Sequence, residues 1–466
     1  MSHPPNIIFI LIDDLGWRDL GCYGSSFYET PRLDHLAAQG MRFTDAYAAC
    51  PVCSPTRASI LTGKYPATVG ITDWIDWGFG VHPCRGKLVD APYLRELPRS
   101  EYTLASALRD GGYQTWHIGK WHLGGPDHRP LEHGFDVNIG GCAWGNPARG
   151  YFSPWQIPAL LDGEAGEFLT DHLTDAAIRL IRERDRRPFF LNLCHYAVHT
   201  PIQAPAALVA KYEAKARALG LDRAVAMEEG EPFPFDLKRH LRVQRRLIQS
   251  DPVYAAMVEN LDWNTGRLLD ALADVGDAEN TMVIFTSDNG GLATSEGSPT
   301  SNRPLAEGKG WMLEGGTREP LLITWPGVIA PGSTCETPVT SPDFYPTLLE
   351  AAGLPFRPDQ HVDGISLLPL LRGDGECDRG PIFWHYPHYG NQGGTPGSSV
   401  RWGDWKLIEF FEDGRLELYN LREDLGETDN VAEAHPERVH ELHGALQAWR
   451  KSVEAKIPER NTNAAA

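Results

Sequence analysis

The chain has 466 residues, of which 42% are hydrophobic and 23% are charged, a composition typical of an ordinary globular protein. This length is large for a single core, so one large domain and one smaller domain are expected. The net charge of −19 argues against nucleic acid as a partner. An anionic substrate would then have to be attracted by a locally basic pocket.

The start of the chain and its cysteines bear on where the protein works. Residues 6–12 already have the pattern of a buried strand, with no basic segment before them and no small-residue cleavage site after them. No apolar run is long enough to span a membrane. The eight cysteines are scattered and lack the paired spacing of a zinc site, which fits reduced thiols. We therefore expect a cytoplasmic protein without a membrane partner.

The first expected strand covers residues 6–12, NIIFILI, and its continuous apolar sequence indicates that both faces are covered. Asp13 and Asp14 follow it directly, just before Gly16. Because ligands of open α/β sheets bind at the carboxyl ends of strands, these carboxylates are candidate cation ligands. The alternative is a helix-capping aspartate beside a solvated one. An amphipathic helix is expected next, over residues 30–40.

Residues 53–63, CSPTRASILTG, predict a helix that begins at Cys53 and ends at Gly63. Pro55 fits the first helical turn, where a missing N–H costs nothing. Cys53 would lie among unpaired backbone N–H groups at the positive end of the helix dipole, with Arg57 one turn further on. A small nucleophile beside a cation at a helix N-terminus is suited to an anion. The alternative is a buried helix start with a structural cysteine.

A long aromatic loop is expected over residues 72–85, and loops of this kind often carry specificity. Its side chains, with others from later segments, could contact a sugar; a loop folded over its own tryptophans is an equal alternative. A hydrogen-bonded structural role is an equal alternative for His195. The candidate substrate contacts are Asp73, Trp74, His82, Arg85, Arg149, His195, His385 and His388.

A short helix over residues 103–109 precedes a strand over residues 113–118. That strand leads into Lys120 and His122, which point to the same face of an extended chain and could serve one pocket.

The next helix–strand pair covers residues 169–182 and 188–193. His199 lies just beyond the end of this strand, a position from which it could reach a site at the edge of the sheet. Residues 206–250 are charged and helical in pattern, and the basic run at 238–246 is expected on a solvated helix face.

A long helix over residues 252–275 is followed by a strand over residues 281–286. Asp288 and Asn289 come directly after this strand, which gives a second acidic strand end. Lys309 lies in a glycine-rich segment further along. A strand and a helix are expected after it, over residues 321–325 and 341–353.

The last part of the chain has a different pattern. A glycine-rich seam at 371–376 divides an expected catalytic domain, residues 1–375, from a smaller one, residues 376–466. Four short strands and one helix indicate an antiparallel sheet with a packed helix. The expected strands cover residues 382–385, 399–402, 405–408 and 416–419, and the helix covers residues 436–453.

Four segments resemble the motifs of the type I sulfatases, a family of the alkaline-phosphatase-like superfamily. They are C-x-P-x-R-x-S-x-x-T-G at 53–63, GKWHLG at 119–124, SDNGG at 287–291, and GKG at 308–310 before GGTREP at 315–320. The resemblance spans nearly the whole chain and is weakest over residues 73–97 and 206–250. It implies an α/β fold with a large mixed, mostly parallel sheet sandwiched by helices, and a small C-terminal α+β subdomain.

The resemblance also implies a mechanism. A maturation enzyme would oxidise Cys53 to formylglycine, whose hydrated aldehyde would be the nucleophile. Lys120 and Lys309 would hold the sulfate, and His199 would protonate the leaving group. His122 would deprotonate the second hydroxyl, which expels sulfate and regenerates the aldehyde; an ordinary serine or cysteine lacks that hydroxyl.

The expected metal ligands are all oxygen atoms. Such a set suits Ca²⁺, with Mg²⁺ as the alternative, whereas zinc prefers nitrogen or sulfur. Arg57 would hold the oxygens at position 53, and the cation would polarise the S–O bond. The expected ligands are Asp13, Asp14, Asp288, Asn289 and an oxygen of residue 53.

Three functions are weighed. The first is a sulfatase that releases sulfate from a sulfated small molecule or saccharide. The second is a phosphonate or phosphodiester hydrolase of the same superfamily, although ordinary phosphatases there use Ser or Thr and two zinc ions with histidine ligands. The third is a non-catalytic metal- or glycan-binding protein, if Cys53 is never oxidised. The sequence does not specify the sugar, the sulfate position or the oligomeric state.

Overall fold

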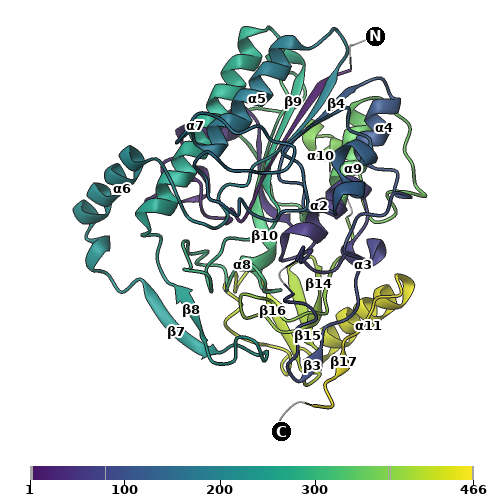
Figure 1. Ribbon diagram of the computed structural model, residues 1–466. Coiled ribbons are helices and arrows are strands. Elements are labelled where there is room, and N and C mark those ends of the chain that lie inside the picture. Colours follow the sequence, from purple (N-terminus) through teal and green to yellow (C-terminus); the bar gives the residue numbers. More distant parts are fainter. Residues whose placement is uncertain (1–3, 79, 376, 378, 464–466) are drawn as a thin grey trace.

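The protein consists of a large sheet covered by helices on both faces and a smaller antiparallel sheet at one end (Figure 1). The computed structural model describes residues 4–463 except 79, 376 and 378. This architecture confirms the expected mixed, mostly parallel α/β fold with a C-terminal antiparallel sheet.

The large sheet is built from nine strands of the described residues. They are β1 Asn6–Ile12, β2 Met41–Tyr47, β4 Gln114–Gly119, β5 Val137–Ile139, β6 Phe189–Cys194, β9 Thr281–Ser287, β10 Arg318–Thr324, β11 Ser333–Cys335 and β12 Val339–Thr340. Their order is β11-β2-β10-β9-β1-β6-β4-β5, and β12 also pairs with β2. The stretch from β9 to β5 is parallel, whereas β10 is antiparallel to both of its neighbours.

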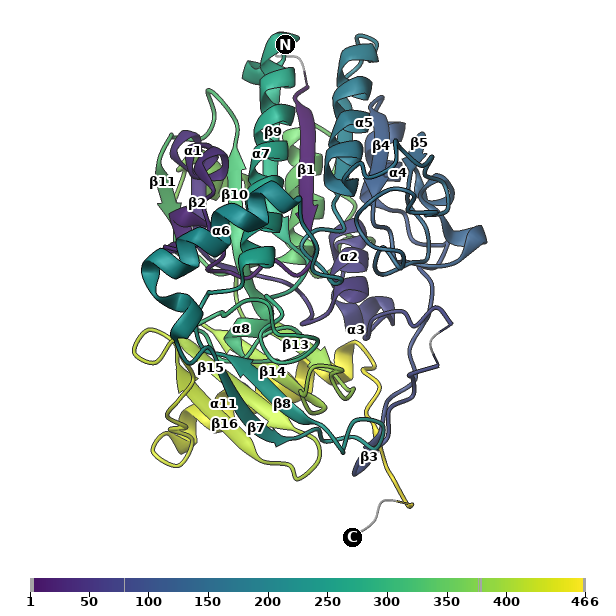
Figure 2. The ribbon, with the colours of Figure 1, turned by 60° about the vertical axis from the view of Figure 1, so that its left-hand side comes forward.

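Helices form a layer on each face of this sheet (Figure 2). One face carries α1 Pro31–Gln39, α5 Leu169–Glu183 and α7 Pro252–Asp274; the other carries α2 Cys53–Thr62, α4 Leu104–Asp110, α9 Phe344–Ala351 and α10 Leu368–Arg372. Strand β1 is buried on both sides because alternate side chains point to opposite faces. Ile8 and Ile10 pack in the first layer, and Ile7 and Phe9 in the second. Among the described residues, no helix is both long enough and apolar enough to cross a membrane.

The smaller sheet lies at the carboxyl-terminal end of the chain. Its strands are β13 Ile382–Tyr386, β14 Gly397–Trp402, β15 Trp405–Phe410 and β16 Leu416–Asn420, and α11 Pro436–Ser452 packs on it. Val400 and Leu407 from the sheet meet Leu442 and Leu446 from the helix. The domain boundary expected at 375/376 falls beside Glu376, which lies outside the described residues.

The expectation of a continuous helical segment over 206–250 was wrong. Helix α6 Ala206–Leu219 is followed by a hairpin of β7 Met227–Pro232 and β8 Arg242–Arg246. The basic run enters β8, where arginines pair with glutamates, as Arg245 does with Glu231 at 2.8 Å. Oppositely charged side chains can pair across a hairpin or along a helix, so the charges in the sequence alone could not show which of these two structures forms.

Candidate active site

Two strand ends bring four oxygen-bearing side chains to one edge of the large sheet. Asp13 and Asp14 follow β1, and Asp288 and Asn289 follow its parallel neighbour β9. All four are buried. Asn289 Nδ2 donates to Asp14 Oδ1 at 2.8 Å, and the Asp14 backbone N–H donates to Asp288 Oδ1 at 3.3 Å. The strand ends that the sequence predicted to converge therefore lie side by side.

Helix α2 points its N-terminus at this edge. It begins at Cys53 and ends before Gly63, which adopts a left-handed conformation with φ of 68°. Arg57 Nε donates to Asp288 Oδ2 at 2.9 Å, and Nη2 of the same guanidinium forms an ion pair with that oxygen at 2.8 Å. Its Nη1 donates to the Lys120 carbonyl at 2.9 Å. This guanidinium fixes the end of β9 against α2 and against the segment after β4.

The segment after β4 delivers a cation and an imidazole to the same point. Lys120 Nζ donates to Asp13 Oδ2 at 2.6 Å. His122 Nδ1 lies 3.3 Å from Cys53 Sγ, and its Nε2 lies 2.9 Å from the Ile75 carbonyl oxygen. A carbonyl only accepts, so Nε2 carries the proton and Nδ1 is an acceptor facing residue 53. Burial, with Lys120 nearby, holds the pKa of His122 well below its usual value, so the imidazole is neutral.

Lys309 and His199 lie on the other side of the acidic pair. Lys309 Nζ is 2.7 Å from Asp14 Oδ1, and His199 Nε2 is 3.6 Å from Asp14 Oδ2. His199 Nδ1 lies 2.9 Å from the Thr200 carbonyl oxygen, which directs Nε2 toward the site. Burial and the charge of Lys309 lower the pKa of His199 to about 3. All six expected catalytic residues thus lie around one point, from α2, the segments after β4 and β6, and the loop before α8 Glu314–Thr317.

The donor set at this point fits a hard cation. Asp13 Oδ1 and Asn289 Oδ1 are buried and have no hydrogen-bond partner, and leaving such atoms unpaired is costly. One ligand atom each from Asp13, Cys53 and Asp288 lie within 4.8 Å of one another. Burial raises the pKa of Asp13, because its charge has too little compensation. Oxygen donors of this kind suit Ca²⁺ or Mg²⁺.

A cavity of about 650 Å³ opens above residue 53. Cys53, His122, His199 and Lys309 lie on its floor, and three tryptophans line it, namely Trp74, Trp77 and Trp144. Large aromatic faces beside cationic groups give a surface for the apolar faces of a sugar together with its charged substituent.

Of the eight candidate substrate contacts, all within the described part of the chain, Trp74 alone lines this cavity. His385 bonds instead to Ser398 Oγ at 2.7 Å and to the Lys456 carbonyl at 2.9 Å. His195 is buried, and Arg85 is exposed away from the cavity. Arg149 is exposed beside Ala148, a lining residue, but does not line the cavity itself.

The remaining candidates, Asp73, His82 and His388, are buried behind Trp74, where they contact one another. The sequence of an irregular loop has no helical or strand periodicity, so it could not indicate which polar side chains face the cavity and which are buried behind it.

Several lining residues had no signal in the sequence. The cavity is also lined by Glu296 from one loop and by Asn391 and Gln392 from another, nearly one hundred residues further along the chain. Asp251 does so too, and its only visible feature was its position before Pro252, where it caps α7.

The fold and the site define an α/β enzyme whose cavity is suited to an anionic ester. Buried cations surround a helix N-terminus, and a neutral imidazole faces the residue at that terminus. Comparison with known proteins then identifies the family.

The sulfatase family profile matches residues 5–354, and a profile described as N-sulphoglucosamine sulphohydrolase, C-terminal, matches residues 307–452. The chain therefore belongs to the sulfatase family and is a sulfuric ester hydrolase.

Similar proteins span most of the chain. A sulfatase of Formosa agariphila is 35% identical over 96% of this chain and 89% of its own. Human N-acetylgalactosamine-6-sulfatase is 34% identical over 82% of this chain and 68% of its own. The crystal structure of Ps i-CgsB superposes with a TM-score of 0.75 at 28% identity, covering 96% of this chain and 93% of that one.

Proposed function

We propose that this sulfatase releases inorganic sulfate from a sulfated carbohydrate, with residue 53 as formylglycine and Ca²⁺ at the strand ends. One observation carries the proposal: Cys53, His122 and Lys309 share the floor of a cavity lined by tryptophans. Two relatives support the substrate class. One is named N-acetylgalactosamine-6-sulfatase. The other, Ps i-CgsB, has been solved with k-i-k-neocarrahexaose and has a TM-score of 0.76 at 28% identity.

The first set of roles concerns residue 53. Formylglycine supplies a hydrated aldehyde, one hydroxyl of which can attack sulfur. After the attack, residue 53 carries the sulfate on one oxygen and a second hydroxyl on the same carbon. His122 receives the proton of that second hydroxyl, since its Nδ1 is an acceptor 3.3 Å from Cys53 Sγ; the aldehyde re-forms as the C–O bond to sulfate breaks and inorganic sulfate leaves. The bond from His122 Nε2 to the Ile75 carbonyl keeps the imidazole in that orientation.

The second set of roles concerns the sulfate and the leaving group. Lys309, which lines the cavity, and Lys120, buried against Asp13, would place positive charge beside the non-bridging oxygens. Ca²⁺ would add positive charge at the same oxygens. His199 Nε2 donates a proton to the leaving oxygen as the S–O bond breaks. Burial, and after it the charge of Lys309, lowers the pKa of His199. An anion bound between Lys309 and His199 offsets the lysine charge, so the imidazole can take up a proton.

Peptide mass spectrometry of residue 53, paired with a sulfate-release screen, tests the proposal. We expect formylglycine at position 53 and turnover of sulfated mono- or oligosaccharides, with matched phosphate esters as controls. The Cys53→Ala variant should fold and lose turnover. Removing divalent cations with EGTA should stop sulfate release, and Ca²⁺ should restore it. Full activity of Cys53→Ala, or faster release of phosphate than of sulfate, would refute the proposal.

A further inference from the structure

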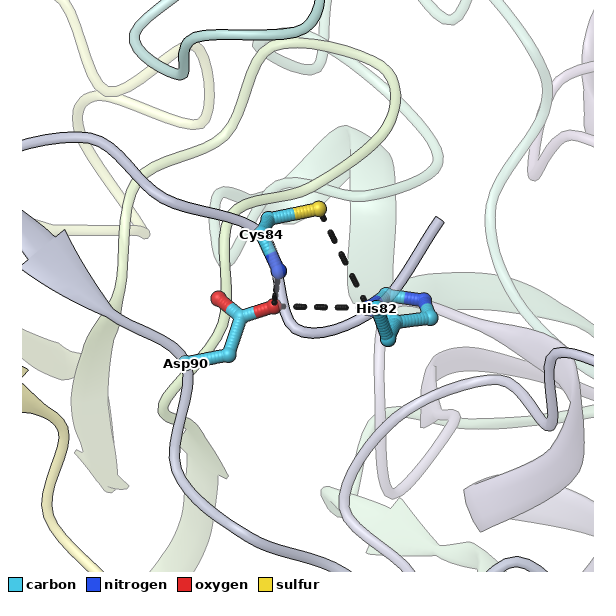
Figure 3. Close-up of side chains that lie close together, drawn as sticks. All are labelled: His82, Cys84 and Asp90. Carbon is cyan, nitrogen blue, oxygen red and sulfur yellow. Dashed lines mark hydrogen bonds and ion pairs between the residues drawn. The ribbon is translucent and has the colours of Figure 1, made fainter. Parts of the chain in front are cut away.

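A second buried cluster lies behind the wall of the active-site cavity. Figure 3 shows three of its members: dashed lines join the Asp90 carboxylate to the Cys84 backbone nitrogen and to His82, and the Cys84 sulfur to His82. His82 Nδ1 lies 3.3 Å from Asp90 Oδ2 and 3.9 Å from Cys84 Sγ. Asp73 Oδ2 approaches the same nitrogen at 3.4 Å. His82, Cys84 and Asp90, residue types that commonly bind metals, each bring a ligand atom within 4.8 Å of the other two, and Asp73 lies beside them.

The polar atoms of this cluster are not satisfied by the protein. Asp73 and His388 have no exposed surface, and His82, Cys84 and Asp90 are at most 8% exposed. Asp73 Oδ2, His82 Nε2 and His388 Nδ1 have no hydrogen-bond partner. The Asp90 oxygens accept from the backbone N–H groups of Cys84 and Tyr389 at 2.7 and 2.9 Å, whereas Asp73 Oδ2 is unpaired. Two carboxylates buried side by side need a compensating positive charge.

A protonated His82 between the two aspartates would supply part of that charge. It would not explain why the Cys84 thiol, which donates to the Val81 carbonyl at 3.6 Å, also lies 3.9 Å from the same nitrogen. Nor would it explain why His388 Nδ1 faces Asp73 Oδ2 at 3.8 Å without a hydrogen bond. The ligand atoms of His82, Cys84 and Asp90, all within 4.8 Å of one another, are instead spaced closely enough to hold one metal ion. Ligand bonds of about 2.0–2.3 Å in a tetrahedron place neighbouring ligand atoms roughly 3.3–3.8 Å apart.

We propose that a Zn²⁺ ion binds here, held by His82 Nδ1, Cys84 Sγ and Asp90 Oδ2, with the Asp73 carboxylate beside these ligands. Imidazole, thiolate and carboxylate together favour zinc over the hard cations that suit the oxygen-only active site. Binding releases the thiol proton of Cys84 and moves the imidazole proton of His82 from Nδ1 to the unpartnered Nε2. His388 Nδ1 then holds the Asp73 carboxylate in place.

Access to this site is open on one side. A cavity of about 400 Å³ borders His82 and Asp90 on this side, and Ile457 and Glu459, near the end of the described chain, also line it. Strand β17 Glu459–Arg460 pairs there with β3 Leu88–Val89. The ion could therefore enter after the chain has folded.

The position of the site suggests what the ion does. Asp73 precedes Trp74, whose ring packs on His82 at 4.8 Å between centroids and also lines the active-site cavity. The next residue, Ile75, provides the carbonyl that orients His122. The ion thus fixes the loop that forms the cavity wall and holds the proposed base.

Cobalt titration tests the site without using activity. In a Cys53→Ala background, which removes the thiol of the active site, we expect one equivalent of Co²⁺ to produce an intense near-ultraviolet thiolate-to-cobalt band. A further Cys84→Ala change should abolish the band, and the matched change at another buried thiol, Cys335→Ala, should leave it. Absence of the band, or its persistence without Cys84, would overturn the proposal.

A second measurement covers the case in which the Cys84 variant does not fold. After divalent cations have been removed and Ca²⁺ restored, one equivalent of Zn²⁺ should bind to the Cys53→Ala protein and raise its melting temperature. The Asp73→Asn change should weaken that binding about 10–100-fold. An unchanged melting temperature with no zinc retained on desalting would refute the zinc site and leave the proposed sulfatase mechanism untouched.

Discussion

His122 shows how a single backbone contact sets the chemistry of a side chain. Its Nε2–H is held by the Ile75 carbonyl, so the other nitrogen is an acceptor that faces residue 53. The same imidazole without this contact could rotate or change tautomer. The role of this residue therefore depends on the loop opposite as much as on the residue itself.

Replacing His122 with Asn should lower kcat for sulfate release by about 10²–10⁴-fold, because no base then faces the hydroxyl at position 53. KM should change little, since the lysines that hold the sulfate remain. His172→Asn, on α5 and paired with Glu167, is the matched control. Steady-state kinetics on protein whose residue 53 has been checked by mass spectrometry gives the comparison; a kcat within a few-fold of the unaltered enzyme contradicts the role.

At the scale of the elements, the predictable part of the site is the part that follows strands. Asp13 and Asp288 were expected together because parallel strands end at the same edge of a sheet, and they lie there. The loop side chains His82 and His388 were expected in the substrate cavity and lie behind it. Regular elements fix where a residue points, whereas in a loop the direction depends on long-range contacts that no local pattern encodes.

The start of helix α4 offers a test of local energetics. Thr103 caps this helix by accepting from the Ser106 N–H at 3.1 Å, and its hydroxyl donates to the His133 carbonyl at 2.6 Å. Thr103→Val keeps the shape but removes both bonds, so the free energy of unfolding should fall by about 1–2 kcal/mol. Urea unfolding measures this, with Thr334→Val on an exposed strand position as control. Equal unfolding midpoints for the two variants would show that the cap contributes nothing.

At the scale of the whole molecule, a buried ion network joins the two sheets. Lys406 on β15 donates to Glu314 on α8 at 2.9 Å and forms an ion pair with Glu427 at 3.0 Å, and all three side chains are buried. Burial opposes ionisation of Glu314, but Lys406 and Arg318 hold its pKa below the usual value. The small domain is therefore tied to the segment that also carries Lys309.

Lys406→Met should destabilise the protein by about 3–5 kcal/mol, because two carboxylates lose their buried partner. Adding Glu314→Gln and Glu427→Gln should recover part of that loss, since fewer charges are then left uncompensated. The midpoints of urea unfolding of the single and triple variants, compared with that of the parent, measure these changes in stability. A single variant as stable as the parent would mean that the network carries no net stabilisation.

Buried histidines make stability depend on pH. Burial, with Arg450 nearby, lowers the pKa of His385 to about 4. The folded state then binds fewer protons than the unfolded state, so this stabilisation is complete above about pH 6.5 and is lost as pH falls toward 4. One such group accounts for about 2 kcal/mol between pH 7 and 5.

His385→Gln should therefore lose less stability than the parent between pH 7 and 5, even if it is less stable at pH 7. Calorimetric melting at several pH values measures the two slopes, and His440→Gln, at an exposed position of α11, is the control. Parallel slopes for the parent and His385→Gln would contradict the assignment.

Every residue of α2 is buried, including Pro55 and Arg57, which belong to the sequence around Cys53. If an enzyme converts Cys53 to an aldehyde, it must therefore read these residues while the chain is still extended. The modification must then be complete before the segment that carries Asp288, more than two hundred residues downstream, folds against the helix. Recombinant yield of active protein would accordingly depend on how quickly the newly made polypeptide is processed, and adding the maturation enzyme to finished molecules would come too late.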